Sequence, residues 1–366
     1  MKVSIISFTL RGIELSFKIK KAFSGETEED LCLYTKCSYA ESGLSYVEQP
    51  LTEWTSEQMK EHRSLLFIGA CGIAVRAIAP FLTDKLNDMP VLVMDEQGRF
   101  VIPILAGHVG GANELAFSLA ERMGSTPVIT TATDLNHCFA VDLFAKRNTL
   151  HIVNKDGIAK VSSRILAGEE VTMAVEEGHL QKGEAGSMGG KKVSGEIDVP
   201  EGIRLMSCSA ESTADILVAP ASYGQGRLLT LRPKEYVIGI GCKRGKAAEQ
   251  IDHFVNRALK ESGISMEQVA AFASIDRKKD EEGILWMSSH YGISFVTYSA
   301  EELQQVEGNF HASEFVKSQV GVDNVCERAA LRFSGPDGIL VTGKQAEDGI
   351  TVAIAKRRWS VSFDEK

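Results

Sequence analysis

The stretch VLVMDEQGRFVIPILAGHVGGANELA, residues 91–116, decides the fold of the first third of the chain. It holds two apolar runs joined by a tight turn at Glu96-Gln97-Gly98, then a loop with three glycines and one histidine, then a helical pattern. The two runs predict an antiparallel hairpin over 90–105. The helix is expected to end near Gly124, a residue type that commonly caps helices.

The segments on both sides of this stretch alternate between strand and helix patterns. Strands are predicted at 2–8, 31–36, 64–70 and 127–131, with helices after Thr9 and from 71 to about Pro80. This alternation is typical of an α/β fold, so the hairpin is predicted to lie in an otherwise parallel sheet.

The chain has 366 residues, which is too long for one ordinary domain. We predict a multi-domain α/β fold of mainly parallel sheets flanked by helices. Its parts are an N-terminal α/β domain (1–135), a middle domain (136–232) and a C-terminal α/β domain (233–366). Within the middle domain, 178–195 is rich in Gly, Lys and Ser and is predicted to be a mobile loop, and 223–235 is interpreted as a hinge.

Composition limits the classes of partner. The formal charge is −9, from 40 Lys and Arg against 49 Asp and Glu, and no block of five like charges predicts a nucleic-acid site. No apolar run has the length of a membrane span, and the opening lacks a signal-peptide pattern, so we expect a cytoplasmic protein. The seven cysteines form no C-x-x-C pair, which predicts neither a disulfide framework nor a zinc site.

The glycine loop offers a candidate catalytic site around His108. Gly107, Gly110 and Gly111 allow backbone N–H groups to approach a ligand, and the start of the following helix carries partial positive charge. His108 can transfer a proton near neutral pH. The alternative is that the glycines only form a tight turn and that His108 only bonds a carbonyl.

Two further groups of polar residues follow predicted strands. Gly72 and Arg76 stand at a second glycine turn, where an arginine is either an edge residue or a ligand for a carboxylate. Thr131, Thr133 and Asp134 are interpreted as ending a strand at the carboxyl edge of the sheet, where open α/β sheets bind ligands.

Polar residues also stand near two predicted helix starts. Asn113 and Glu114 fall in the first turn of the helix after the glycine loop, where capping is the alternative role. Lys243, Arg244 and Lys246 belong to GIGCKRGK, which fits neither a dinucleotide fingerprint nor a P-loop in its spacing. An anion site and a solvated basic loop are the two interpretations of that cluster.

With these motifs assembled, the chain resembles the cobalt-precorrin-5A hydrolase family of anaerobic cobalamin (vitamin B12) biosynthesis. The motifs occur in the family's order and lie in the N-terminal and C-terminal regions, whereas the middle region carries little of the resemblance. They are GIAVRAIAPFLTDK (72–85), VMDEQGRFVIPILAGHVGGANELA (93–116), VITTATD (128–134), GIGCKRGK (239–246), ASIDRKKDEEGI (273–284), VCERAAL (325–331) and GITVAIAK (349–356).

The resemblance implies a three-part protein whose C-terminal part is similar to a stand-alone protein of the aerobic pathway. It also implies the reaction: water opens the δ-lactone of cobalt-precorrin-5A, and acetaldehyde leaves to give cobalt-precorrin-5B. No cofactor and no protein-bound metal is expected, because the tetrapyrrole substrate carries the cobalt. Neighbouring enzymes of the cobalamin pathway are candidate partners.

The roles of the site residues are inferred from their chemistry. A tetrapyrrole fringed with carboxylates needs several anion sites, which glycine turns and the basic cluster can supply. Lactone opening needs a base and an oxyanion site, and we assign these to His108 and to the N–H groups of Gly110 and Gly111. Glu114 and Asp134 are the next candidates for the base.

The alternatives concern both the identity of the base and the class of protein. Histidines such as His311 lie beside helices without a glycine nest, so they are weaker candidates for the base. The same glycine turns would also serve a non-catalytic tetrapyrrole-binding or handover protein. An unrelated α/β hydrolase has little support, because no G-x-S-x-G nucleophile elbow occurs.

Overall fold

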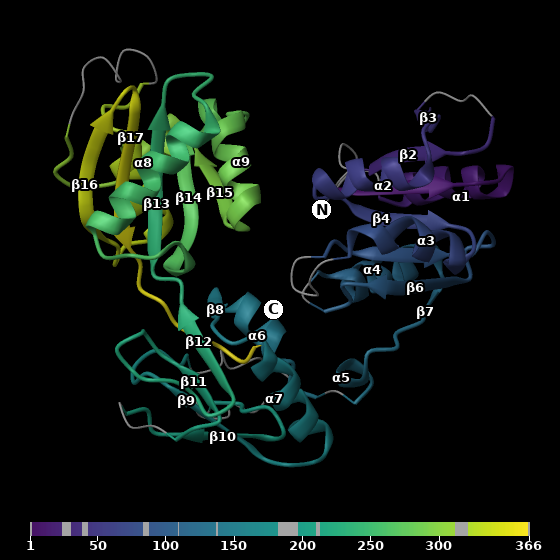
Figure 1. Cartoon of the computed structure of the whole chain (residues 1–366), viewed down its shortest axis with the longest axis horizontal. Coiled ribbons are helices and arrows are strands. Elements are labelled where there is room, and N and C mark those ends of the chain that lie inside the picture. Colours follow the sequence, from purple (N-terminus) through teal and green to yellow (C-terminus); the bar gives the residue numbers. More distant parts are fainter. Residues whose placement is uncertain are drawn as a thin grey trace, which may run out of the picture. The chain divides into compact units, whose positions relative to one another are not determined.

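The computed structural model contains two compact units, Met1–Leu143 and Phe144–Lys366, and each is described on its own (Figure 1). The described residues are 2–23, 31–38, 43–82, 88–108, 110–136, 138–181, 197–209, 213–311 and 321–364.

The first unit is built on a seven-stranded sheet with the order β3-β2-β1-β4-β5-β6-β7. Its strands are β1 (Val3–Ser7), β2 (Leu31–Thr35), β3 (Leu44–Tyr46), β4 (Ser64–Ile68), β5 (Val91–Met94), β6 (Phe100–Leu105) and β7 (Thr126–Pro127). Neighbouring strands are parallel except β5 and β6, which are antiparallel. The hairpin predicted at 90–105 is therefore confirmed.

Helices cover both faces of this sheet. The unit contains α1 (Leu10–Ala22), α2 (Leu51–Lys60), α3 (Cys71–Ile78), α4 (Ala112–Met123) and the short α5 (Ala132–Leu135). Apolar side chains of α1 and α4 pack on one face, and those of α2 and α3 pack on the other. Because both faces are covered, all five residues of β1 and of β4 are buried, which explains their continuous apolar sequence.

Local signals fix the ends of these helices. Thr9 caps α1 because its side-chain oxygen accepts the Gly12 N–H. Gly124 ends α4 in the left-handed conformation with φ at +67°, as its position in the sequence predicted.

The reversal between β5 and β6 decides where the glycine loop lies. In the strand register, Leu105 at the end of β6 pairs with Val91, and Val91 pairs with Leu65 near the start of β4. The end of β6 therefore lies at the edge of the sheet where β4 and β5 begin. The glycine loop that follows Leu105 starts from this amino edge.

The prediction of a strand over 127–131 is wrong for most of its length. β7 contains only Thr126 and Pro127, and α5 begins at Ala132. β7 pairs with only Phe100 and Val101 at the start of β6, its one neighbour in the sheet, and the chain then leaves the sheet for α5. Thr131 consequently precedes a helix and Thr133 lies within it, so neither residue ends a strand at the carboxyl edge.

The second unit contains a middle sheet of five strands in the order β10-β9-β11-β12-β8. Its elements are β8 (Leu150–Ile152), β9 (Val171–Val175), β10 (Ile203–Met206), β11 (Ile216–Val218), β12 (Leu229–Pro233), α6 (Val141–Arg147), which begins before the unit boundary, and α7 (Asp156–Leu166). β8 is antiparallel to β12, and the other pairs are parallel.

The interpretation of 223–235 as a hinge is wrong, because this segment contains β12. Leu229 and Leu231 are fully buried, and β12 pairs with β11 on one side and β8 on the other. The polar residues that obscured the strand are satisfied inside the protein: Thr230 accepts the Gly226 N–H, and Arg232 donates to carbonyl oxygens of the preceding loop. The predicted mobile loop at 178–195 lies mostly outside the described residues, which resume at 197.

A third sheet of five strands has the order β15-β14-β13-β17-β16. Its strands are β13 (Tyr236–Cys242), β14 (Val269–Ile275), β15 (Ser294–Tyr298), β16 (Ile339–Glu347) and β17 (Ile350–Lys356), and its helices are α8 (Ala248–Glu261), α9 (Glu282–Tyr291), α10 (Ala300–Gln304) and α12 (Cys326–Ser334). β17 is antiparallel to both neighbours, and β13, β14 and β15 are parallel. The predicted multi-domain α/β fold class is confirmed.

The segment after β17 returns to the middle sheet. The Val361 N–H donates to the His179 carbonyl oxygen, and the Gln181 N–H donates to that of Val361. Trp359 is buried, and its ring stacks on His179 at a centroid distance of 3.9 Å. The boundaries at 135 and 232 stay predictions, and part of the sequence assigned to the last domain packs on the middle sheet.

Among the described residues, none of the helices combines the length and the apolar character that crossing a membrane requires. Within that same part of the chain, no cluster of three His, Cys, Asp or Glu side chains is arranged to hold a metal ion. The seven cysteines are free thiols.

Candidate active site

The glycine loop before α4 uses its backbone groups to build the helix start. The Ala112 N–H donates to the Ala106 carbonyl at 3.1 Å, and the Asn113 N–H donates to the Gly107 carbonyl at 3.0 Å. The Gly111 N–H donates to the His108 carbonyl at 2.9 Å. These amides are therefore occupied within the loop. Contrary to the prediction, the Gly111 N–H is not presented to a ligand.

The local geometry requires a glycine at each of these three positions of the loop. Gly111 adopts a left-handed conformation with φ at +89°, which costs other residues strain. A Cβ at Gly107 would lie 2.9 Å from Asn113 Oδ1, and a Cβ at Gly110 would lie 2.3 Å from the Ala106 Cβ. The glycines thus permit a tight turn, which is the alternative that the sequence left open, and Gly110 is the remaining candidate for the predicted oxyanion role.

The structure brings four predicted site residues together beside this turn. His108 Nε2 lies 2.9 Å from Thr133 Oγ1, and Asn113 Nδ2 donates to Thr131 Oγ1 at 3.4 Å. Asn113 is buried, whereas His108 is partly exposed. A partly exposed imidazole beside a hydroxyl can take a proton from water, because one ring nitrogen of a neutral histidine is an acceptor.

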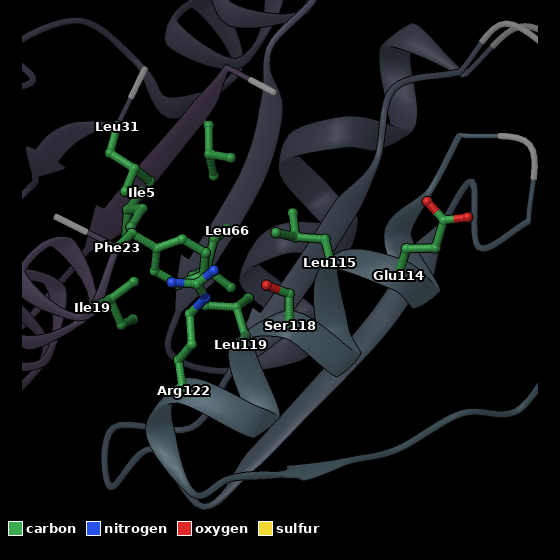
Figure 2. A pocket seen from close by; sticks show the side chains of 11 residues that line it. Ile5, Ile19, Phe23, Leu31, Leu66, Glu114, Leu115, Ser118, Leu119 and Arg122 are labelled. Carbon is green, nitrogen blue, oxygen red and sulfur yellow. The ribbon is translucent and has the colours of Figure 1, made fainter. Parts of the chain in front are cut away.

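Glu114 is separate from this group of contacts, and the side chain of Asp134 lies outside what the structure describes. Glu114 stands on an exposed position of α4 and lines a different pocket of about 270 Å³, between α1, α4 and the sheet (Figure 2). Leucine, isoleucine, valine and phenylalanine side chains dominate the lining, and Figure 2 shows the Glu114 carboxylate pointing away from them. A pocket of this composition suits an apolar ligand rather than an anionic one.

Gly72 and Arg76 lie at the opposite edge of the sheet from His108. They belong to α3, which follows β4, and the Gly69 N–H donates to the Met94 carbonyl at the ends of β4 and β5. Arg76 is exposed, and its Nη1 donates to the Gly72 carbonyl at 3.2 Å. This places a guanidinium at the carboxyl edge of the parallel strands. The topological switch point of the sheet, between β1 and β4, lies at the same edge.

The basic loop, residues 243–246, is a third group, and it follows β13 in the second unit. Lys246 is committed to an ion pair with Asp348 at 2.7 Å. The Lys243 N–H donates to the Gly349 carbonyl, and Arg244 is exposed. Because α8 begins only at Ala248, these cations precede the helix and do not occupy its first turn.

Glu281, which sequence reasoning missed, anchors this basic loop. Its buried carboxylate accepts the Gly245 N–H at 2.6 Å and an ammonium proton of Lys278 at 2.7 Å. Burial alone would raise the pKa of the Glu281 carboxyl, but the hydrogen bonds from Lys278 and Gly245 outweigh burial and lower it. The sequence signal for this ion pair is the spacing of three residues between Lys278 and Glu281 in ASIDRKKDEEGI.

Sequence reasoning also missed the contact between His311 and Glu327. His311 Nδ1 lies 2.8 Å from Glu327 Oε1, although 16 residues separate the two in sequence. The sequence around His311 contains no glycine nest, and the residues next to Glu327 in VCERAAL do not indicate its partner.

The chain is a multi-domain α/β protein of the cobalamin synthesis G class. The family model described as "Cobalamin synthesis G N-terminal" matches residues 53–134, and the one described as "Cobalamin synthesis G C-terminus" matches 236–355. The chain belongs to the cobalt-precorrin-5A hydrolase family, as its motifs predicted.

Two relatives that match most of the length of both chains support this assignment. A cobalt-precorrin-5A hydrolase from Priestia megaterium is 30% identical over 363 residues, which cover 96% of this chain and 94% of that protein. The one from Salmonella typhimurium is 32% identical over 329 residues, covering 83% of this chain and 91% of that protein. Protein CobE from a Sinorhizobium species is 30% identical over 120 residues, which cover 32% of this chain and 78% of that protein.

The anchoring role of Glu281 predicts a pH-dependent stability. Since its folded-state pKa is lowered, its stabilisation is fully present above the ordinary glutamate pKa of about 4.3 and disappears as the pH falls through the folded value. Glu281→Gln should therefore lower the urea midpoint of unfolding at pH 6, and the difference from wild type should shrink at pH 3. Glu282→Gln, at the exposed neighbouring position, is the control. An equal difference at both pH values would contradict this role.

Proposed function

We propose that this protein is a cobalt-precorrin-5A hydrolase, in which water opens the δ-lactone and acetaldehyde leaves to give cobalt-precorrin-5B. The names of relatives that match almost the whole chain support the activity. The structural observation that carries it is the pairing of His108 Nε2 with Thr133 Oγ1 at 2.9 Å, next to Asn113 and Thr131.

His108 would act as the general base for the first step. It takes a proton from water as the water oxygen attacks the lactone carbonyl, and the ring then opens to a carboxylate and an alcohol. A positioned base of this kind contributes roughly 10² to 10⁴ in rate. Thr133 would orient the imidazole, and the Gly110 N–H is the remaining donor for the oxyanion. Glu114 and Asp134 are the next candidates for the base.

The second step releases the two-carbon fragment and also needs proton transfers. The freed hydroxyl loses its proton as its C–O bond becomes C=O. The adjacent C–C bond breaks, its electron pair passes to the macrocycle, and a carbon of the macrocycle takes a proton. Atoms and charge balance without an oxidant or a reductant, so the proposal needs no redox cofactor. The cobalt belongs to the substrate.

The carboxylates of the tetrapyrrole need cationic partners. We assign this role to Arg76 with Gly72 at the carboxyl edge of the first sheet, and to Lys243, Arg244 and Lys246 in the second unit. Arg76 lies in the last turn of α3, and an arginine suits a carboxylate because its N–H groups match the two oxygen atoms. Lys246 already pairs with Asp348, so Lys243 and Arg244 should contribute most of the binding in the basic loop.

We also propose a cytoplasmic location, with neighbouring enzymes of the cobalamin pathway as partners. Seven free cysteines suit a reducing compartment. A reactive biosynthetic tetrapyrrole is also better transferred between enzymes than released to solvent.

The role of His108 predicts a change in turnover without a change in binding. His108→Asn keeps a polar side chain of similar size but removes the titrating base. We expect normal folding and little loss of corrinoid affinity, with acetaldehyde release reduced at least about a hundredfold. His253→Asn, at an exposed position of α8, should turn over normally. Near-normal release by His108→Asn would assign the residue to the turn alone and would move the search for the base to Glu114 and Asp134.

The role of the basic loop predicts a change in KM. A double variant, Lys243→Ala with Arg244→Ala, should raise the apparent KM about tenfold or more and lower kcat less, because it removes charged contacts to the substrate. Lys260→Ala, in the last turn of α8, removes a surface positive charge outside the loop and is the control. If the double variant keeps the wild-type KM, the loop is a solvated surface feature.

A further inference from the structure

Glu327 is a fully buried carboxylate in the first turn of α12. Its oxygens accept the His311 N–H at 3.0 Å, the Lys344 N–H at 2.7 Å and an amide proton of Asn324. They also face the His311 imidazole, with Nδ1 at 2.8 Å from Oε1. The carboxylate therefore fixes the position of the loop before residue 312, of β16 and of one histidine ring.

The arrangement fixes which atom of His311 faces outward. A carboxylate can only accept hydrogen bonds, so Nδ1 is the donor in this contact. In the neutral imidazole, Nε2 then keeps its lone pair, and ring geometry turns it away from Glu327. The His311 side chain is 72% exposed, so Nε2 is accessible to a ligand.

The electrostatics of Glu327 suit a positioning residue. Burial alone would raise the pKa of its carboxyl, but the hydrogen bonds from the Lys344 N–H and from His311 outweigh burial and hold the pKa below its usual value. The group is thus an anion at neutral pH. A buried anion behind an imidazole orients the ring and stabilises the imidazolium that forms when Nε2 takes a proton, as in other acid–base pairs of histidine and carboxylate.

The pair lies beside β16, an outer strand of the third sheet. β16 and β13 run in the same direction, because each is antiparallel to β17. Lys344, which contacts Glu327, is near the end of β16, and the basic loop follows the end of β13. In the register, the neighbouring Gln345 is level with Ile240 of β13, and the chain continues from the end of β13 into the basic loop, where the proposed function already expects substrate carboxylates.

A purely structural role does not need the imidazole. The Glu327 carboxylate already holds the loop through the His311 and Lys344 backbone N–H groups, which any side chain at position 311 would leave in place. His290, another exposed histidine of this unit, differs because its ring stacks on Trp286 at 4.6 Å.

We propose that His311 is a second catalytic residue of the hydrolase, held by Glu327 as a positioning residue, and that it serves the release of the two-carbon fragment. This inference rests on the proposed function. His311 Nε2 takes the proton of the hydroxyl that lactone opening frees, while the C–C bond breaks and acetaldehyde forms. The resulting imidazolium then gives a proton to the carbon of the macrocycle that received the electron pair.

The test is a single-turnover reaction of the purified full-length protein with cobalt-precorrin-5A, in which the lactone-opened intermediate and acetaldehyde are measured separately. In His311→Asn, lactone opening should proceed within about threefold of wild type, acetaldehyde release should fall at least about a hundredfold, and the opened intermediate should accumulate. His290→Asn should behave as wild type. Glu327→Gln should show the same accumulation, less severely, if its melting temperature shows that it folds.

Other outcomes overturn the inference. Wild-type acetaldehyde release by His311→Asn would make His311 a surface residue without a catalytic role. An equal loss of both steps would show a structural defect instead of a role in the second step. Both results differ from failure of the proposed function, in which the wild-type protein itself would open no lactone and release no acetaldehyde.

Discussion

The reversal of the chain between β5 and β6 is the constraint on which the first unit depends. The Asp95 carboxylate accepts the Arg99 and Phe100 N–H groups, and Gly98 adopts φ at +68°, so the chain turns back within a few residues. β6 then runs against its neighbour β5 and delivers His108 to the edge where the parallel strands begin. Without this turn, the glycine loop would lie at the same edge as Arg76. The reversal therefore separates the base from that candidate carboxylate site.

Buried carboxylates organise the second unit in a comparable way. Asp215, Glu281 and Glu327 are all buried, and burial would raise the pKa of each. Hydrogen-bond donors outweigh burial in all three, so the carboxylates stay ionised and each holds particular partners: Thr172 for Asp215, the basic loop for Glu281 and His311 for Glu327. Because an unpaired buried charge is costly, these contacts fix local geometry more firmly than exposed ion pairs do. Two of the three lie beside residues with a proposed role in the reaction.

The sequence predicts elements whose signals are local and misses those that depend on tertiary contacts. The hairpin, the helix after Thr9 and the Gly124 cap carry their own turn or capping residues, and all three are confirmed. β12 was missed because Thr230 and Arg232 interrupt its apolar pattern and are satisfied only by partners elsewhere in the fold. The sequence identified His108 and Thr133 as candidate site residues but did not predict their contact. It gave no indication of the contact between His311 and Glu327. Contacts across many residues leave no spacing pattern that a single sequence can reveal.

Hydrolysis of the lactone by activated water is the central claim, and the destination of the water oxygen tests it most directly. A single turnover of cobalt-precorrin-5A in water enriched with oxygen-18, followed by mass spectrometry of cobalt-precorrin-5B, locates that atom. Attack of water on the lactone carbonyl predicts a single oxygen-18 in the newly freed acetate carboxylate. A product whose new carboxylate carries no oxygen-18, although acetaldehyde is released, would contradict the account, because the lactone would then open without attack of water on its carbonyl.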